Sequence, residues 1–260
     1  MENLAGLNNI FNDTDAWRTA LTLGFAMLVA WQAGRRLGRR LQAEGTEIPV
    51  SKFLDGSLAL LGLLLGFTFS MAIAKYDQRR LALLADSNAI GDFYTCATLL
   101  KDPVRTQLQS VIRDYTRLRV DLASRRISPG ELEDALERMQ HMQGRMTALV
   151  DQALTAGTPI SVSLTNTLNG LTSNHAARLS AIRDRLPATV VLLLLVAAVV
   201  ASLLVGREQG ASNETDLAGT ICFIMLATFV VFVILDLNQP ERGLITVNQE
   251  PMVRLLSSMK

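Results

Sequence analysis

The residues of this chain with the most informative chemistry lie on an apolar stretch between Asp55 and Lys75. The stretch holds 19 residues without a charge, which is about the length that a helix needs to cross a hydrocarbon core of roughly 30 Å. Hydroxyl groups and bulky apolar side chains can line an ion path without any charged group inside the membrane. The candidates for such a lining are Leu63, Phe67, Thr68 and Ser70.

The same stretch carries a stripe of small residues, one at every fourth position. Such a stripe lets two helix backbones approach closely, and the partner helix belongs either to the same chain or to another subunit. The hydroxyls of Thr68 and Ser70 then have a simpler role, because they can bond back to their own helix. The residues of the stripe are Gly62, Gly66, Ser70 and Ala74.

A charged collar follows the apolar stretch directly. Basic residues at the end of a span commonly anchor it at the membrane surface, and this interpretation needs no further function. If several copies surround one axis, the same residues form a vestibule that attracts anions, with Asp77 reducing the positive field. The collar consists of Lys75, Tyr76, Asp77, Arg79 and Arg80.

Four apolar runs predict an all-α integral membrane protein. Mean hydropathy is +0.27, and 49% of the residues are hydrophobic, which favours a membrane protein over a soluble one. The runs at 19–34, 56–74, 186–206 and 217–235 predict four transmembrane helices, and hence a multi-pass protein of the cell (inner) membrane. None of them contains Asp, Glu, Lys, Arg or His. This argues against a proton-coupled transporter, which needs an ionisable group near the midplane.

Between the second and third runs, the sequence is predicted to be helical throughout. Apolar residues recur there at spacings of three and four, the pattern of helices that bury one face. We therefore expect a bundle of four long helices inserted between spans two and three. The predicted parts are 1–75 with the N-terminal tail and spans one and two, 76–187 with the bundle, 188–236 with spans three and four, and 237–260 as a C-terminal tail.

The sequence contains no recognisable enzymatic motif. It has no phosphate-binding or dinucleotide-binding glycine loop and no HExxH zinc motif, so we expect no enzyme, no metal and no cofactor. A net charge of +1 gives no field that would attract nucleic acid. His175, near the apolar stripe of the last bundle helix, is either bonded at the bundle seam or a metal- or pH-sensing group. Cys96, outside the apolar runs, offers no disulfide framework.

Charge counting leaves the orientation of the bundle open. Five basic residues lie between spans one and two, which places the bundle outside the cytoplasm by the positive-inside rule for the first span. Ten basic residues flank the spans on the bundle side, against six on the other side. That wider count favours a cytoplasmic bundle.

Three short motifs resemble the bestrophin-like membrane family. The collar at 76–80 is followed by a signature at 86–91 that contains Asp86, Asn88 and Gly91. Asp86 stands there where the family has Glu. A second signature lies at 236–243, in which Asn replaces an Asp of the family. Its residues are Asp236, Asn238, Pro240 and Gly243.

This resemblance implies a function. Bestrophins are pentameric anion channels with four spans, a pore on the second span and cytoplasmic termini. By this resemblance the chain is a homo-oligomeric, chloride-type anion channel, a pentamer if the likeness extends that far, with a cytoplasmic bundle. Its partners are then the lipid bilayer, small inorganic ions and copies of itself.

The alternative function is a membrane-anchored sensor or scaffold whose bundle binds a ligand or a partner protein. Such a protein needs a separate output partner, because neither the loop between the first two spans nor the C-terminal tail is large enough for an output module. One contact is expected under either function. We predict that Asp86 or Asp236 pairs with Arg79 or Arg80 at the membrane surface.

Overall fold

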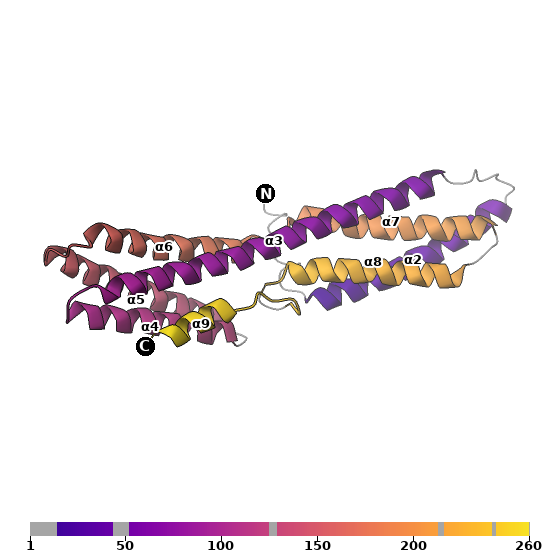
Figure 1. The fold of residues 1–260 in the computed structure, drawn as a ribbon. Helices are drawn as coiled ribbons and strands as arrows, with labels where there is room; N and C mark the ends of the chain where they lie inside the picture. The colour runs from indigo at the N-terminus through magenta and orange to yellow at the C-terminus, as the bar shows by residue number, and fades with distance from the viewer. Residues whose placement is uncertain (1–14, 44–51, 125–128, 213–215, 241–242, 260) are drawn as a thin grey trace. The chain divides into compact units, whose positions relative to one another are not determined.

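The computed structural model describes residues 15–43, 52–124, 129–212, 216–240 and 243–259, and every regular element among them is a helix (Figure 1). The chain forms two compact units. The first, here named the apolar unit, contains Met1–Tyr76 and Arg185–Thr246. The second, the bundle unit, contains Asp77–Asp184 and Val247–Lys260. The helix α3 (Lys52–Thr98) contributes residues to both units.

The apolar unit is built from the first part of α3 and three further helices. These are α2 (Ala16–Ala43), α7 (Ala188–Ser212) and α8 (Leu217–Leu237). Among the described residues, three helical stretches are long and apolar enough to cross a membrane: Phe53–Thr98, Ser161–Ser212, whose apolar part is α7, and Leu217–Leu237. The helix α2 is not among them, and its uncharged run, 19–34, has 16 residues. That α2 is a fourth span stays a prediction.

The helices α2 and α7 touch backbone to backbone through two pairs of glycines. A Cβ atom added at Gly34 would lie 2.0 Å from the Leu203 carbonyl oxygen, and one at Gly206 would lie 2.0 Å from the carbonyl oxygen of Trp31. Gly38 and Gly210 make the same kind of contact one turn further along. No side chain fits at these positions, so the four glycines set the separation of the two helices.

The bundle unit has a single apolar core made by five helical segments. They are the second part of α3, α4 (Val104–Ser124), α5 (Pro129–Thr155), α6 (Ser161–Arg183) and the short helix α9 (Glu250–Ser258). Ile90, Phe93, Ile112 and Leu171 are fully buried in this core. Met252 and Met259 bring the C-terminal segment into this core.

Candidate functional site

One side of α3 is uncovered within the apolar unit. Leu63, Phe67 and Ser70 are exposed, Phe67 by 63%, and a Cβ atom added at Gly62 or Gly66 would meet nothing within 4 Å. Residues three, four and seven apart share one side of a helix, so these positions form one continuous surface. We name it the open face, and it consists of Gly62, Leu63, Gly66, Phe67, Ser70 and Ala74.

The small-residue stripe is therefore not a contact between α3 and another described helix of the same chain. Of the two partners that the sequence allowed, a helix of the same chain and a helix of another subunit, the first is absent at Gly62 and Gly66 among the described residues. The close backbone approach that the chain does use lies elsewhere, at the glycines of α2 and α7. The sequence contains a signal for this contact, because these glycines recur at a spacing of four residues, at Gly34 and Gly38 and again at Gly206 and Gly210.

Thr68 lies on the opposite side of α3 from the open face. It is only 2% exposed, near the buried Leu61 and Ala72 along the same side of the helix, and its hydroxyl donates a hydrogen bond to the Leu64 carbonyl oxygen at 2.6 Å. The prediction that Thr68 lines a path together with Leu63 and Phe67 is thus corrected. A hydroxyl in the core of the unit that is bonded to its own helix is not available to a passing ion.

The collar residues separate into buried and exposed members. Lys75 and Tyr76 are half-buried, and Asp77 and Arg80 are exposed. Arg79 is only 3% exposed. The prediction that the whole collar forms an anion-attracting vestibule is therefore corrected as well. Its central cation, Arg79, lies in the interior of the bundle unit.

Arg79 has a structural role inside that unit. Its Nε donates to the Ala181 carbonyl oxygen at 3.2 Å, and its Nη2 donates to the Asp184 carbonyl oxygen at 3.0 Å. Both carbonyls lie at the C-terminal end of α6, where the last carbonyl groups of a helix lack intrahelical partners and attract cations.

A buried polar cluster holds three helices of the bundle unit together. Asp86 on α3 is 0% exposed and forms ion pairs with Arg119 on α4 and Arg178 on α6, the latter at 3.2 Å. The phenol oxygen of Tyr115 accepts hydrogen bonds from Arg119 at 3.0 Å and from the side-chain amide of Gln143 at 3.2 Å. Burial raises the pKa of Tyr115, so its hydroxyl stays protonated. We call Asp86, Tyr115, Arg119, His175 and Arg178 the Asp86 cluster.

The pairing of Asp236 with Arg79 or Arg80 stays a prediction, because these residues belong to different units. The predicted pairing of Asp86 with Arg79 or Arg80 is wrong. Asp86 binds Arg119 and Arg178 instead, which lie 33 and 92 residues further along the chain. The motifs in the sequence do not single out Arg119. It continues the apolar spacing of Leu108, Ile112 and Tyr115 on α4, so a charged residue at a core position was the available signal.

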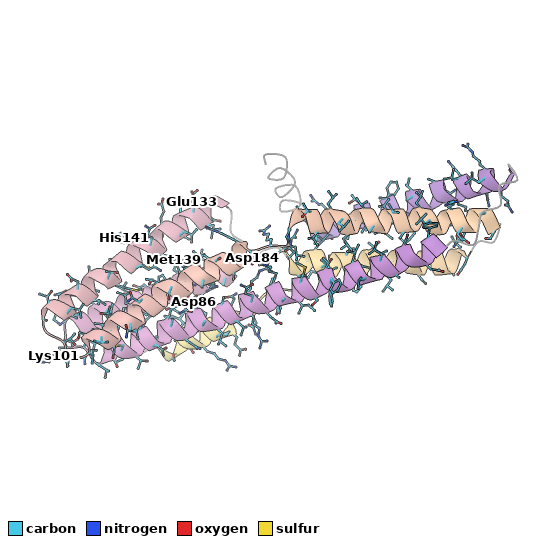
Figure 2. The ribbon with its side chains drawn as sticks, turned by 90° about the horizontal axis from the view of Figure 1, so that it is seen from above. Asp86, Lys101, Glu133, Met139, His141 and Asp184 are labelled. Carbon is cyan, nitrogen blue, oxygen red and sulfur yellow. The ribbon has the colours of Figure 1, made fainter. Side chains whose placement is uncertain are left out.

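His175 completes this cluster through packing of its ring. Its Nδ1 is buried and has no hydrogen-bond partner among the described residues, and its ring meets that of Tyr115 edge-on, with 6.2 Å between the centroids. Burial, followed by the charge of Arg119, lowers the pKa of His175 to about 4. The imidazole is therefore neutral at pH 7. His141 on α5, labelled in Figure 2 together with Asp86, is exposed.

The second signature builds a tight turn at the end of α8. The buried carboxylate of Asp236 accepts hydrogen bonds from the backbone N–H groups of Leu244 and Ile245, both at 2.8 Å. Asn238 accepts one from the Leu186 N–H at 2.7 Å. A Cβ atom at Gly243 would lie 2.7 Å from the Asp236 carbonyl oxygen, so only glycine fits. Half-buried Pro240 lies in the same turn. These residues shape the apolar unit.

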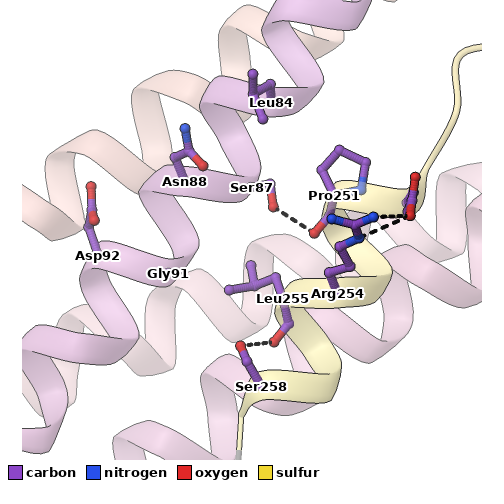
Figure 3. Close-up of a pocket in the computed structure, with 10 residues that line it drawn as sticks. Leu84, Ser87, Asn88, Gly91, Asp92, Pro251, Arg254, Leu255 and Ser258 are labelled. Atoms are coloured by element: carbon purple, nitrogen blue, oxygen red, sulfur yellow. Dashed lines mark hydrogen bonds and ion pairs between the residues drawn. The ribbon is translucent and has the colours of Figure 1, made fainter.

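The first signature holds the C-terminal helix on α3. The hydroxyl of Ser87 donates to the Pro251 carbonyl oxygen at 3.2 Å, and a Cβ atom at Gly91 would lie 3.2 Å from the Leu255 side chain. Between α3 and α9 lies an open groove of about 760 Å³, in which the exposed Asn88 takes part (Figure 3). No group of three metal-ligating side chains occurs in the described parts of the chain.

The sequence as a whole matches one family description, the Bestrophin-like domain, over residues 20–252. The chain belongs to the bestrophin-like family. The match extends over nearly the full length, so it includes the open face, the Asp86 cluster and both signatures, and it confirms the resemblance drawn from the short motifs. Comparisons with curated proteins and with solved structures found no match.

We expect Asp86→Asn to lower the free energy of unfolding by about 3–5 kcal/mol, because Arg119 and Arg178 would stay buried without their carboxylate. Asp114→Asn is the matched control, since it removes an exposed ion pair with Arg117 and should cost less than about 1 kcal/mol. Guanidinium unfolding of the detergent-solubilised protein, followed by circular dichroism, measures both. Equal losses in the two variants would contradict the role of Asp86.

Lowering the pH should destabilise the bundle unit partly through His175. The unfolded chain binds the proton at a pKa near 6.5, and the folded chain binds it only near 4. Stability from the neutral imidazole is therefore complete above pH 6.5 and is lost as the pH falls toward 4.

His175→Gln should consequently show a smaller fall in melting temperature between pH 7.5 and 4.5 than the wild-type protein. His141→Gln, which changes an exposed histidine, should keep the wild-type fall. If His175→Gln also keeps it, the imidazole does not resist protonation in the folded bundle.

Proposed function

We propose that the protein is a homo-oligomeric ion channel of the bestrophin type, in which the open face of α3 lines the pore. Four spans (α2, the first part of α3, α7 and α8) would cross the cell (inner) membrane, with the bundle inserted between the second and third of them. A pentamer with the bundle in the cytoplasm is the assembly that the family implies. The observation that carries the proposal is the uncovered open face.

The open face has the chemistry of a pore lining. It has no ionisable group, and it combines the Ser70 hydroxyl with small residues and the bulky Leu63 and Phe67. Hydroxyls and backbone dipoles can solvate an ion, and large apolar side chains can form a constriction that gates by dewetting. In a single copy this face would be one more lipid-exposed surface. In a ring of copies it faces the axis.

Membrane embedding of α2 is supported by its outer surface. Leu21, Phe25 and Val29 are exposed on α2, as are Leu193 on α7 and Phe229 on α8. Large apolar side chains exposed on several helices of one unit are costly in water and favourable in a bilayer. The glycine contacts with α7 tie α2 to a helix that is itself long and apolar enough to span.

Selectivity for small anions of the chloride type is the part of the proposal that rests on the family. The collar adds less to it than the sequence suggested, because Arg79 bonds to the carbonyls of α6. Arg80 is the exposed cation of the collar, and the exposed Asp77 accompanies it. Measurement of the reversal potential therefore decides the permeant ion independently of the pore location.

Purified protein in planar bilayers should give unitary currents that reverse at the chloride equilibrium potential. Phe67→Ala removes the largest side chain of the open face and should raise the unitary conductance severalfold. Phe229→Ala, which shortens an exposed phenylalanine of α8, is the matched control and should leave the conductance unchanged. Silence with every ion tested, or equal effects of the two substitutions, would reject the pore on α3.

One observation favours a second candidate function, a membrane-anchored sensor or scaffold. The Asp86 cluster buries two guanidinium groups against one carboxylate, beside an imidazole nitrogen without a partner among the described residues. A buried cluster with this excess of positive charge is an arrangement that an anionic ligand can rebalance. Specific recovery of a partner protein by crosslinking, from a protein that carries no current, would favour this candidate.

A further inference from the structure

The outer surface of α2 changes from apolar to strongly basic along the helix. Leu21, Phe25 and Val29 lie along it at spacings of four residues, and all are exposed. The same side of the helix continues, through exposed Gln32, into a basic end. The residues of that end are Arg36, Arg39 and Arg40, all exposed.

The opposite surface of α2 packs inside the apolar unit. Met27, Gly34 and Gly38 are buried there, and the two glycines lie against the backbone of α7. The arginine side therefore cannot turn toward α7 without breaking the glycine contacts. It is the side that α2 presents outward.

The exposed arginines form no ion pair within the described residues. The helix α2 contains no Asp or Glu between Ala16 and Ala43. Arg36, Arg39 and Arg40 take part in none of the ion pairs among the described residues. Three such charges on neighbouring turns of one helix repel one another unless an anion lies between them.

The helix α7 adds a fourth cation at the same end of α2. Arg207 contributes its backbone to the contact with Gly38, and its Nε is buried without a hydrogen-bond acceptor among the described residues. Arg35 lies close by, with its guanidinium over the Trp31 ring at 5.6 Å. The neighbouring carboxylate on this part of α7 is Glu208. Positive charge therefore exceeds negative charge where α2 and α7 meet.

The spacing along the helix fits one leaflet of a bilayer. At 1.5 Å per residue, Phe25 and Arg36 are separated by roughly 16 Å, about half of a 30 Å hydrocarbon core. An acyl chain lying along the apolar part would thus bring its headgroup to the arginines. Guanidinium groups bind phosphate oxygens through paired hydrogen bonds and are the common choice for this purpose.

We propose that this surface binds an anionic phospholipid. Arg36, Arg39 and Arg40 hold the headgroup phosphate, and Leu21, Phe25 and Val29 contact an acyl chain. The inference rests on the proposed embedding of α2 in the membrane but not on ion conduction. Clusters of arginine directly beside a span attract anionic lipid surfaces by their charge alone, and the apolar part of α2 makes the site specific for a lipid rather than for free phosphate.

The test is binding of short-chain lipids to the purified full-length protein in neutral detergent, counted by native mass spectrometry. Dioctanoyl phosphatidylglycerol should bind at least tenfold more tightly than dioctanoyl phosphatidylcholine. The triple substitution Arg36→Gln, Arg39→Gln and Arg40→Gln should abolish this preference. The control removes three exposed charges of the bundle unit, by Arg117→Gln, Arg138→Gln and Arg145→Gln, and should keep it.

A second variant tests whether the triple Gln variant loses the lipid preference only because it misfolds. Replacing Arg36, Arg39 and Arg40 by Lys keeps the charge and should preserve most of the preference for phosphatidylglycerol. Equal binding of the two lipids by the wild-type protein, or retention of the preference in the triple Gln variant, would overturn the proposal. Glycerol phosphate that competes as strongly as the intact lipid would overturn it too, since the acyl chain would then contribute nothing.

The result is separable from the proposed channel activity. A protein that binds phosphatidylglycerol in this way but carries no current keeps the lipid site and loses the channel. A protein that carries current but binds both lipids equally loses the lipid site alone.

Discussion

The structure depends on the division of α3 into two sides. In the apolar unit one side is buried, with Leu61 and Ala72 in the core. The other side, in the apolar unit, is the open face. Within the apolar unit, α3 cannot rotate to cover the open face, because rotation would expose Leu61 and Ala72 at a cost of roughly 25 cal/mol per Å² of apolar surface.

The residues of the two signatures, at 86–91 and 236–243, have mainly structural roles. Asp86 is the counter-charge for two buried arginines, and Asp236 closes the turn after α8. A buried carboxylate with two guanidinium partners fixes the relative position of three helices, since removing any partner leaves an uncompensated charge. Arg79 fixes the position of the C-terminal end of α6 by hydrogen bonds to its carbonyl oxygens. The signature residues of this chain therefore belong to its scaffold, and none of them lies on the open face.

The sequence predicted the helices and the apolar stretch of α3, because both depend on local spacing. Helical periodicity also predicts that Thr68 and Phe67 lie on different sides of α3. Which of these two sides is buried depends, however, on helices that are distant in the sequence. The partners of Asp86 could not be predicted for the same reason, since Arg119 and Arg178 come from other helices. Arg79 and Arg80 are equivalent in the sequence, and only packing makes the first buried and the second exposed.

Whether the open faces of α3 in neighbouring copies surround one axis, as proposed, is tested by disulfide crosslinking in native membranes. The background carries Cys96→Ser and Cys222→Ser, and Ser70→Cys is compared with Thr68→Cys under mild oxidation. Covalent dimers are expected for Ser70→Cys and none for Thr68→Cys, which places its thiol on the buried side of the helix. Monomers for Ser70→Cys, or equal crosslinking of both variants, would contradict it.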